Sequence, residues 1–194
     1  LDRMGALIDD LLTLARQGET VTDFDSIDLA ALVENCWGTV ETTNASLVVE
    51  IDSETSIQGD ASRLKQVFEN LMRNAVEHGS TSSRSRTGDA VEHGSLDVTV
   101  TVGELDDGFY VADDGPGIPE EDRSQIFDAG YSTANAGTGF GLSIVDQIVG
   151  AHGWSIQVSE SEAGGVRFEI TGVSGAGSAS YERVGGNNGG DPTV

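Results

Sequence analysis

The sequence predicts an α+β domain, because stretches with the periodicity of helices alternate with stretches typical of strands. Helices are expected where apolar residues recur at helical spacing, over residues 28–41, 61–78 and 140–151. Strands are expected over Leu47–Ile51, 96–104, 109–112, 154–159 and 166–171, with a short extended piece at Ser56–Gln58. Glycine-containing turns, Asp106-Asp107-Gly108 and Gly164-Gly165, would join two pairs of these strands as hairpins. A chain of 194 residues is long enough for one such domain with a sizeable core.

Polar residues mark where the first two helices of this domain should begin. Asp25 to Asp28 offer capping side chains for the helix at 28–41, and Asp60 offers one for the helix at 61–78. A further helix is expected over residues 1–18, where Leu7, Ile8 and Leu11 belong to an apolar stripe. So short an appendage has no partner for that stripe, which is typical of the end of a longer coiled or bundled helix.

The domain itself is expected to span residues 24–173. Residues 79–95 predict an inserted surface loop, because the hexamer AVEHGS at 75–80 occurs again at 90–95. Residues 120–126 predict a short helix. Residues 174–194 are rich in glycine, serine and asparagine, and this composition predicts a disordered tail.

The charge of the chain disfavours binding to nucleic acid or to an anionic membrane. Asp and Glu number 33 against 10 Lys and Arg, and the formal net charge is −23. This composition is similar to that of proteins from salt-loving archaea, where high salt screens self-repulsion.

Cys36 is the only cysteine, which excludes an internal disulfide and predicts a buried small hydrophobe in an intracellular protein. No apolar run is long enough to span a membrane, and no signal peptide is visible. The chain begins at Leu1 and not at Met, so we expect a piece of a longer protein. This piece should be cytoplasmic, and its parent could be membrane-anchored.

One candidate binding motif is VADDGPGIP at 111–119. Asp113 ends a predicted strand, and a carboxylate there can accept a hydrogen bond from an exocyclic amine such as that of adenine. Gly115 and Gly117 leave room for a base or ribose to approach the main chain. The alternative is an ordinary acidic turn, because Asp-Gly and Gly-Pro pairs occur in many loops.

A second candidate motif is GTGFGLSIV at 137–145, where Gly137, Gly139 and Gly141 precede a predicted helix. Exposed amides at a helix N-terminus suit phosphate oxygens. The motif is neither a Walker P-loop, which needs a following Gly-Lys-Ser/Thr, nor a Rossmann fingerprint. By itself, a glycine triplet before a helix is weak evidence for a phosphate site.

A third candidate motif is FENLMRNAVEHG at 68–79. Asn70 and Asn74 are four residues apart and should therefore share one face of the helix, next to its apolar face. Two carboxamides that point into a cleft could bind Mg²⁺ through their oxygens. The alternative is that both asparagines bond to neighbouring main-chain groups.

Together and in this order, the three motifs resemble those of the GHKL, or Bergerat-fold, ATPases, and within them those of sensor histidine kinases. NLMRNA at 70–75, DDGPGI at 113–118, Ile126-Phe127 and GTGFGL at 137–142 correspond to the N, G1, F and G2 boxes, and the likeness covers residues 28–171. The resemblance implies a two-layer α/β sandwich with a mixed sheet, and ATP and Mg²⁺ as cofactors. It implies that Asn74, assisted by Asn70, binds Mg²⁺, that Asp113 reads adenine, and that residues 128–138 form a lid. The implied ATP-binding residues are Asn70, Asn74, His78, Asp113, Gly115, Gly117, Ile118, Phe127, Gly137, Thr138, Gly139, Phe140, Gly141 and Leu142.

The histidines carry weaker signals. His78 lies where the family often has an aromatic or basic residue near the nucleotide, although a solvated histidine at a helix end is at least as common an explanation. His152 should be a structural residue at a helix C-terminus, where positive charge is favoured. His93 falls in the predicted insertion and has no expected role.

One residue points to a kinase in preference to other ATPases of this resemblance. Asn70 lies where the water-activating members carry a glutamate base, and a carboxamide cannot take a proton from water. Glu69 is one residue away and would point elsewhere on the helix. No phosphoacceptor histidine is expected in this chain, which should bind ATP without phosphorylating itself. The DLLTLAR end of the first helix, within residues 1–18, is similar to the end of a kinase dimerisation helix.

The implied activity of the whole protein is phosphoryl transfer from ATP to a histidine outside this chain, and then to an aspartate of a response-regulator receiver domain. A homodimer through dimerisation helices is implied as well, and no nucleic-acid partner. Two alternatives remain at this point: an anti-sigma-type serine kinase with the same fold, and a nucleotide-binding regulatory module without kinase activity.

Overall fold

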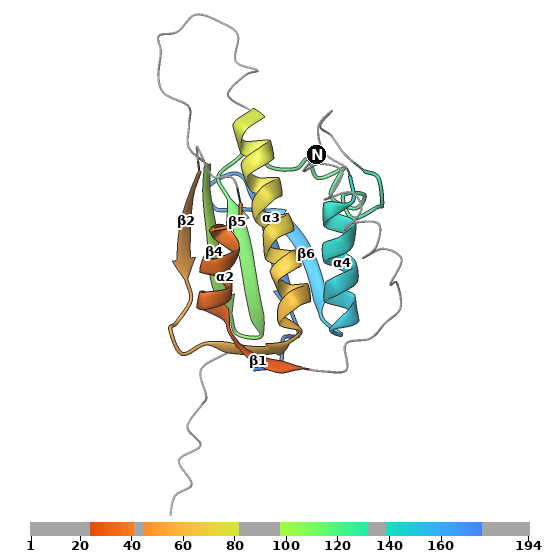
Figure 1. The fold of residues 1–194 in the computed structure, drawn as a ribbon. Coiled ribbons are helices and arrows are strands. Elements are labelled where there is room, and N and C mark those ends of the chain that lie inside the picture. Colours follow the sequence, from red (N-terminus) through yellow and green to blue (C-terminus); the bar gives the residue numbers. More distant parts are fainter. Residues whose placement is uncertain (1–23, 41–44, 82–97, 132–138, 176–194) are drawn as a thin grey trace, which may run out of the picture.

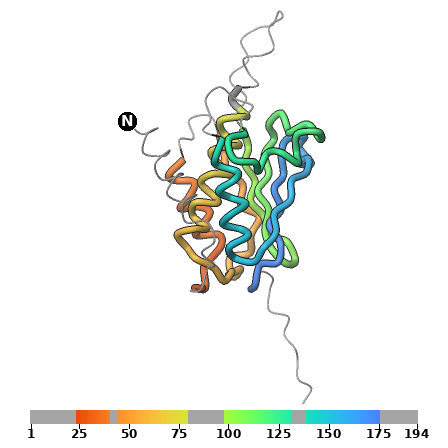
Figure 2. Tube along the Cα trace, turned by 90° about the vertical axis from the view of Figure 1, so that its right-hand side faces the viewer, coloured from red at the N-terminus to blue at the C-terminus, as the bar shows by residue number. Residues whose placement is uncertain are grey.

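Three helices lie against one face of a five-stranded sheet, so that the domain has two layers (Figures 1 and 2). The structure is a computed structural model, and it describes residues 24–40, 45–81, 98–131 and 139–175. The helices are α2 (Leu29–Trp37), α3 (Ala61–Thr81) and α4 (Gly141–Ala151). Among these described residues, no helix has the length and apolar character needed to cross a bilayer.

The sheet is mixed, as the resemblance implies. Its strand order is β2-β4-β5-β7-β6, and β2 pairs with β4 in parallel while all the other neighbours are antiparallel. A separate two-stranded sheet joins β1 to β3. The strands are β1 (Asp25–Asp28), β2 (Ala45–Glu50), β3 (Ser56–Gly59), β4 (Val98–Leu105), β5 (Gly108–Asp113), β6 (Ser155–Glu160) and β7 (Val166–Thr171).

The core forms between the two layers because each element has one apolar face. Along β4, Val98, Val100 and Val102 are buried, whereas the intervening threonines are half-exposed on the other face of the sheet. The rings of Phe68 on α3 and Phe109 on β5 lie 5.0 Å apart between centroids and bridge the layers. Cys36 is fully buried in this core, as predicted.

The predicted helix starts are confirmed by their hydrogen bonds. Asp28 Oδ1 accepts from the Ala31 amide at 2.9 Å and so caps α2. Asp60 Oδ1 accepts from the amides of Ser62 and Arg63 at 2.9 and 3.1 Å and caps α3. These caps set where both helices begin, and the first turn of α3 in turn sets the register of the asparagines further along it.

The end of α3 differs from the prediction, because the helix continues to Thr81 instead of ending at 78. Residues 79–81 therefore belong to the helix and not to the predicted loop at 79–95, whose remaining residues lie outside the described ranges. Gly79 lies in this extension and packs against β4. A Cβ there would overlap the side chain of Val98, so glycine lets the helix end pack directly on β4.

One further expectation was wrong. Residues 120–126 form a series of turns and not a helix, with amides of Asp122 and Gln125 bonded to carbonyls three residues earlier at 3.0 and 2.9 Å. Of this segment only Ile126 is buried, so it has no apolar face to hold a helix against the core. In addition, Asp25–Asp28 form a strand as well as providing the cap, pairing with β3.

The remaining predicted boundaries agree to within a few residues, with exceptions at the chain ends. Ser174, assigned to the predicted tail, accepts a hydrogen bond from the Gln58 amide on β3 at 3.0 Å, so the described domain continues to 175. The predicted helix at 1–18 and the rest of the tail, 176–194, lie outside the described residues.

His152 connects the end of α4 to the start of α3. Its Nδ1 lies 2.7 Å from the Ile148 carbonyl oxygen, and its Nε2 lies 3.1 Å from the Asp60 amide, which donates to it. Nδ1 therefore carries the single ring proton and Nε2 is the acceptor. Burial lowers the pKa of His152 below its usual value, against the opposing effects of Ile148 and Asp60. The structural role agrees with the prediction, but the ring is neutral and not the charged helix-end residue that was expected.

We expect this histidine to make the stability of the domain depend on pH. Protonation is easier in the unfolded chain, so the contribution of His152 is present above about pH 6.5 and is lost as the pH falls below it. His152→Phe keeps a ring against Trp154 but leaves the Asp60 amide unpaired, which costs about 1–3 kcal/mol at neutral pH. Urea unfolding of both proteins from about pH 8 to about pH 5 measures the difference. A difference that did not shrink at low pH would contradict this assignment.

Candidate nucleotide-binding site

The start of α4 meets the middle of α3 at a pair of carboxamides. A Cβ built on Gly141 would lie 3.7 Å from Asn70 Oδ1 and 3.8 Å from Asn74 Oδ1. Both asparagines therefore present their side chains to the same place, the first residue of α4. Glycine at that position leaves the space between the two helices open to a ligand.

Asn70 has a polar atom that the protein leaves unsatisfied. The residue is 6% exposed, and its Nδ2 is the one buried side-chain nitrogen or oxygen without a hydrogen-bond partner among the described residues. Its Oδ1 lies 3.5 Å from Arg73 Nη1. An unpaired buried donor costs about 1–3 kcal/mol, so its retention suits a site where a ligand oxygen completes the bond. Asn74 is half-buried beside it.

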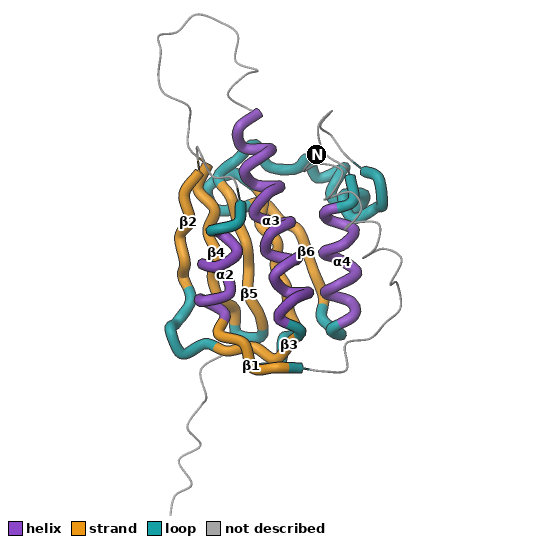
Figure 3. The backbone as a smooth tube through the Cα atoms, in the orientation of Figure 1, coloured by secondary structure: helices purple, strands orange, loops and turns teal. Residues whose placement is uncertain are grey.

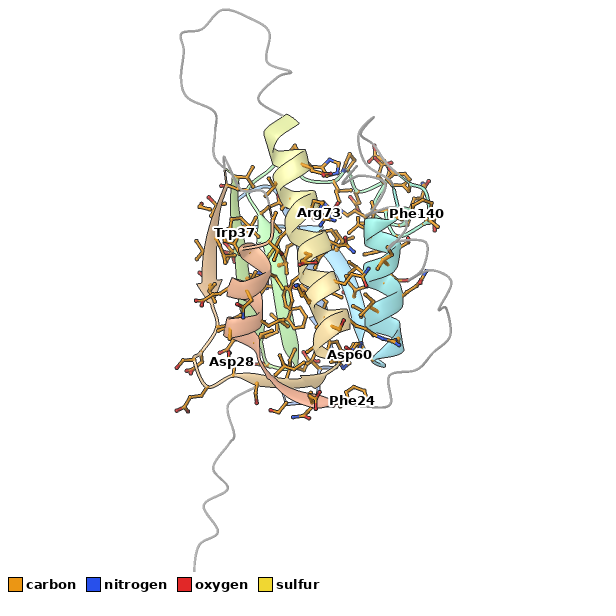
Figure 4. All side chains as sticks on the ribbon, viewed as in Figure 1. Phe24, Asp28, Trp37, Asp60, Arg73 and Phe140 are labelled. Atoms are coloured by element: carbon orange, nitrogen blue, oxygen red, sulfur yellow. The ribbon has the colours of Figure 1, made fainter. Side chains whose placement is uncertain are left out.

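The N-terminus of α4 offers main-chain donors at the same place. Phe140 occupies the capping position without a side-chain cap, and the first turn carries no acidic residue. The first amides of a helix have no partner within the helix, and their positive dipole end favours anions. Figure 4 shows Phe140 and Arg73 at the same end of the helical layer, opposite to Asp60. This end of α4 can therefore bind phosphate oxygens close to the two asparagines.

Asp113 ends β5, at the edge of the sheet where the loops in Figure 3 gather around the start of α4. Its Oδ1 accepts from the amides of Gly115 and Val166 at 2.9 and 3.2 Å, and its main-chain oxygen accepts from Ser161 Oγ at 2.6 Å. Burial raises the pKa of Asp113, while the two amide bonds and the charge of His78 oppose that rise. The carboxylate is thus held in one orientation through its Oδ1.

Glycines shape the loops around these groups. Gly117 has a φ of +74°, and a Cβ on Gly115 would lie 2.9 Å from Asp113 Oδ1. Gly139 has a φ of +73°, and its carbonyl accepts from the Gly130 amide at 2.9 Å. That bond joins Gly130, in the described part of the predicted lid at 128–138, to the residue that follows the lid. Gly137, Thr138 and most of that lid lie outside the described residues.

The apolar residues predicted to bind ATP have different surroundings. Ile118, Phe127, Phe140 and Leu142 are all partly buried against the core. Phe127 packs edge-on against Phe168 of β7, with 6.3 Å between ring centroids. The structure thus places Phe127 in the core beneath the loops, while Phe140 is at the start of α4.

Comparison with known proteins identifies the arrangement. Residues 59–172 match the family described as histidine kinase-, DNA gyrase B- and HSP90-like ATPases. The chain belongs to this ATPase family. It is 30% identical over 175 residues to the sensor histidine kinase ZraS of Escherichia coli K12, covering 87% of this chain and 35% of that protein. The chain therefore spans about a third of the length of the curated relatives it matches.

Two solved structures of histidine kinases are similar to this chain. The catalytic domain of histidine kinase ThkA superposes with a TM-score of 0.59 at 27% identity, covering 77% of this chain and 94% of that one. Full-length ShkA, solved in complex with AMPPNP, gives a TM-score of 0.68 at 26% identity, covering 91% of this chain and 37% of that one. This ATPase domain is thus an ATP-binding catalytic domain of the sensor histidine kinase kind.

Glu69 is directed away from the nucleotide site of this ATPase domain. Its Oε1 accepts from Thr39 Oγ1 at 2.7 Å and lies 3.7 Å from Lys65 Nζ, on the side of α3 that faces α2. A glutamate so placed cannot serve as a base beside Asn74. Within the described residues, no group of three or more His, Cys, Asp or Glu side chains could hold a metal ion.

Sequence reasoning missed the residues that hold Asp113. Ser161, Gly165 and Val166 come from the β6–β7 turn and the start of β7, and Gly164-Gly165 predicted only a hairpin turn. A Cβ on Gly165 would overlap both the main-chain and side-chain oxygens of Asp113. Arg73 was missed as well, although the sequence places it between the two asparagines. Ser161 and Val166 contact Asp113 from 48 and 53 residues away, which no local pattern contains. Arg73 lies three residues from Asn70, so helical spacing could have indicated their contact.

Proposed function

We propose that this domain is the catalytic part of a two-component sensor kinase, which passes the γ-phosphoryl of ATP to a histidine outside these residues and then to a response-regulator aspartate. The observation that carries the proposal is the placement of Asn70 and Asn74 against Gly141, at an uncapped helix N-terminus. Carboxamide oxygens for a cation and main-chain amides for phosphates meet at that point.

The roles of the residues follow from their positions. Asn74, with Asn70 beside it, would hold Mg²⁺, which neutralises charge on the transferred phosphoryl group. Gly137, Gly139 and Gly141 would border the phosphates. Asp113 Oδ2 would accept from the adenine amine, with Gly115, Gly117 and Ile118 beside the base and His78 close to the carboxylate.

A protein acceptor suits this site better than water does. Asn70 has no basic atom to take a proton from water, and Glu69 is held by Thr39 on another side of α3. What remains is positioning and charge neutralisation, which suffice for phosphoryl transfer to a nucleophile that another element presents. We further propose that residues 1–18 are the end of the dimerisation helix, that the whole protein is a homodimer, and that this domain lies in the cytoplasm of a membrane-anchored parent.

Removing the Asn74 carboxamide tests this site. Asn74→Ala should abolish the gain in ATP affinity that Mg²⁺ produces, because the cation loses its protein ligand, and we expect a loss of about tenfold or more. Calorimetric titration of the 194-residue chain with AMPPNP, in excess Mg²⁺ and then in EDTA, measures that gain. Asn35→Ala, an exposed asparagine on α2, is the matched control and should bind as the unchanged chain does.

The same pair of variants in the full-length protein tests the reaction. With labelled ATP, the unchanged protein and Asn35→Ala should acquire acid-labile phosphate, as phosphohistidine does, and Asn74→Ala should acquire none. Acid-stable label would indicate a serine kinase, and nucleotide binding without any label would indicate a regulatory module. Equal Mg²⁺ dependence in all three proteins would overturn the assignment of Asn74.

A further inference from the structure

The electrostatics of the site pose a problem that Mg²⁺ alone does not solve. ATP carries about four negative charges at neutral pH, and a bound divalent cation neutralises only part of them. The chain has a formal net charge of −23, and residues 128–142 contain no lysine or arginine. A triphosphate bound at α4 needs a further positive group within contact distance.

Most described basic side chains are committed elsewhere. Three of them form salt bridges: Arg63 Nε lies 3.5 Å from Asp60 Oδ2, Lys65 Nζ lies 3.7 Å from Glu69 Oε1, and Arg167 Nε lies 2.7 Å from Glu169 Oε1. Arg123 donates through Nε to the Ile118 carbonyl at 3.1 Å. Arg73 lies beside the asparagine pair and forms no salt bridge, and no other lysine or arginine among the described residues meets both conditions.

The contact between Arg73 and Asn70 also sets which way the Asn70 amide faces. A guanidinium has donors and no acceptor, so the atom 3.5 Å from Arg73 Nη1 must be the amide oxygen. Nδ2 is then the buried donor without a partner. An oxygen that already faces a guanidinium is a poor Mg²⁺ ligand because the two cations would repel each other. A phosphate oxygen, in contrast, can accept from Nδ2 and from the guanidinium together.

We propose that Arg73 binds the triphosphate at this site and holds Asn70 with its Nδ2 turned towards a phosphate oxygen, which leaves Asn74 as the magnesium ligand. The inference rests on the proposed function, because it assumes that ATP occupies the space beside Gly141. It adds a division of labour, by which we mean that Asn70 donates to a phosphate oxygen whereas Asn74 coordinates Mg²⁺.

The test compares charge removal at Arg73, in the middle of α3, with charge removal at Arg63, near its start. Arg73→Gln should weaken AMPPNP binding by about tenfold or more, as expected when a charge-assisted contact is lost, and should leave AMP binding within about threefold. Arg73→Lys keeps the positive charge and should recover part of the loss. Arg63→Gln makes the same charge change about 15 Å earlier along the helix and should leave both affinities unchanged.

Asn70→Asp separates the two possible roles of Asn70. If its oxygen bound Mg²⁺, a carboxylate would increase the Mg²⁺-dependent gain in affinity, which would overturn the division of labour. If Nδ2 donates to phosphate, the variant should weaken AMPPNP binding with and without Mg²⁺. Circular dichroism and thermal unfolding identify any variant that fails to fold.

The outcomes distinguish this inference from the proposed function. AMPPNP binding by the unchanged chain, with Arg73→Gln binding as tightly as Arg63→Gln, would overturn the role of Arg73 alone. Failure of the unchanged, folded chain to bind AMPPNP would overturn the proposed function, and the inference with it.

Discussion

Asp113→Asn should weaken ATP binding by about 10- to 100-fold and reduce the preference for adenine. Oδ1 of Asp113 already accepts from the Gly115 and Val166 amides. An asparagine should therefore keep its oxygen at those amides and turn its Nδ2 towards the base. Two donors, the side-chain amide and the adenine amine, would then face each other. That loss in affinity corresponds to about 1.4–2.7 kcal/mol, within the cost expected of a buried donor without a partner.

A second nucleotide makes this prediction selective. ITP carries a carbonyl oxygen where ATP carries the amine, so Asp113→Asn should bind ITP better relative to ATP than the unchanged chain does. Asp106→Asn is the matched control, because Asp106 is an exposed aspartate in the turn at the opposite end of β5. Competition titrations measure the ratio of the two dissociation constants. A ratio equal in all three proteins would show that Asp113 does not contact the base.

Gly165→Ala should both destabilise the domain and disrupt ATP binding. The added methyl group would overlap the main-chain oxygen and Oδ1 of Asp113. The main-chain oxygen belongs to the end of β5 and is bonded to Ser161, so it cannot move without breaking the turn. Overpacking of this kind costs about 1–3 kcal/mol, and any displacement moves the carboxylate that we propose reads the base.

The control for this change is Gly150→Ala on α4. Nothing lies within 4 Å of a Cβ at Gly150, and alanine in a helix is favoured over glycine, so the variant should gain about 0.5–1 kcal/mol. Urea unfolding gives both free energies, and titration with AMPPNP gives the affinities. If Gly165→Ala matched the unchanged chain in both measurements, the coupling between the β6–β7 turn and Asp113 would be refuted.

The parts of the fold and site that could be predicted are those encoded locally. The capping aspartates Asp28 and Asp60 lie within three residues of the amides they bind, and the asparagines are one helical turn apart. Strand β1 could not be predicted, because Ile27 is the one apolar residue in it and the strand exists through pairing with β3. The support of Asp113 was hidden for a similar reason, since Ser161 and Val166 lie 48 and 53 residues further along the chain.

The makeup of the candidate site has an evolutionary consequence. Its polar atoms belong to two carboxamides, one of them beside an arginine, to main-chain amides at the start of α4, and to one half-buried aspartate. Few exposed charges are needed near the ligand, so acidic residues could accumulate over the rest of the surface without altering the groups that face it. In such a domain, the surface can adapt to its solvent while the groups that carry out the chemistry stay the same.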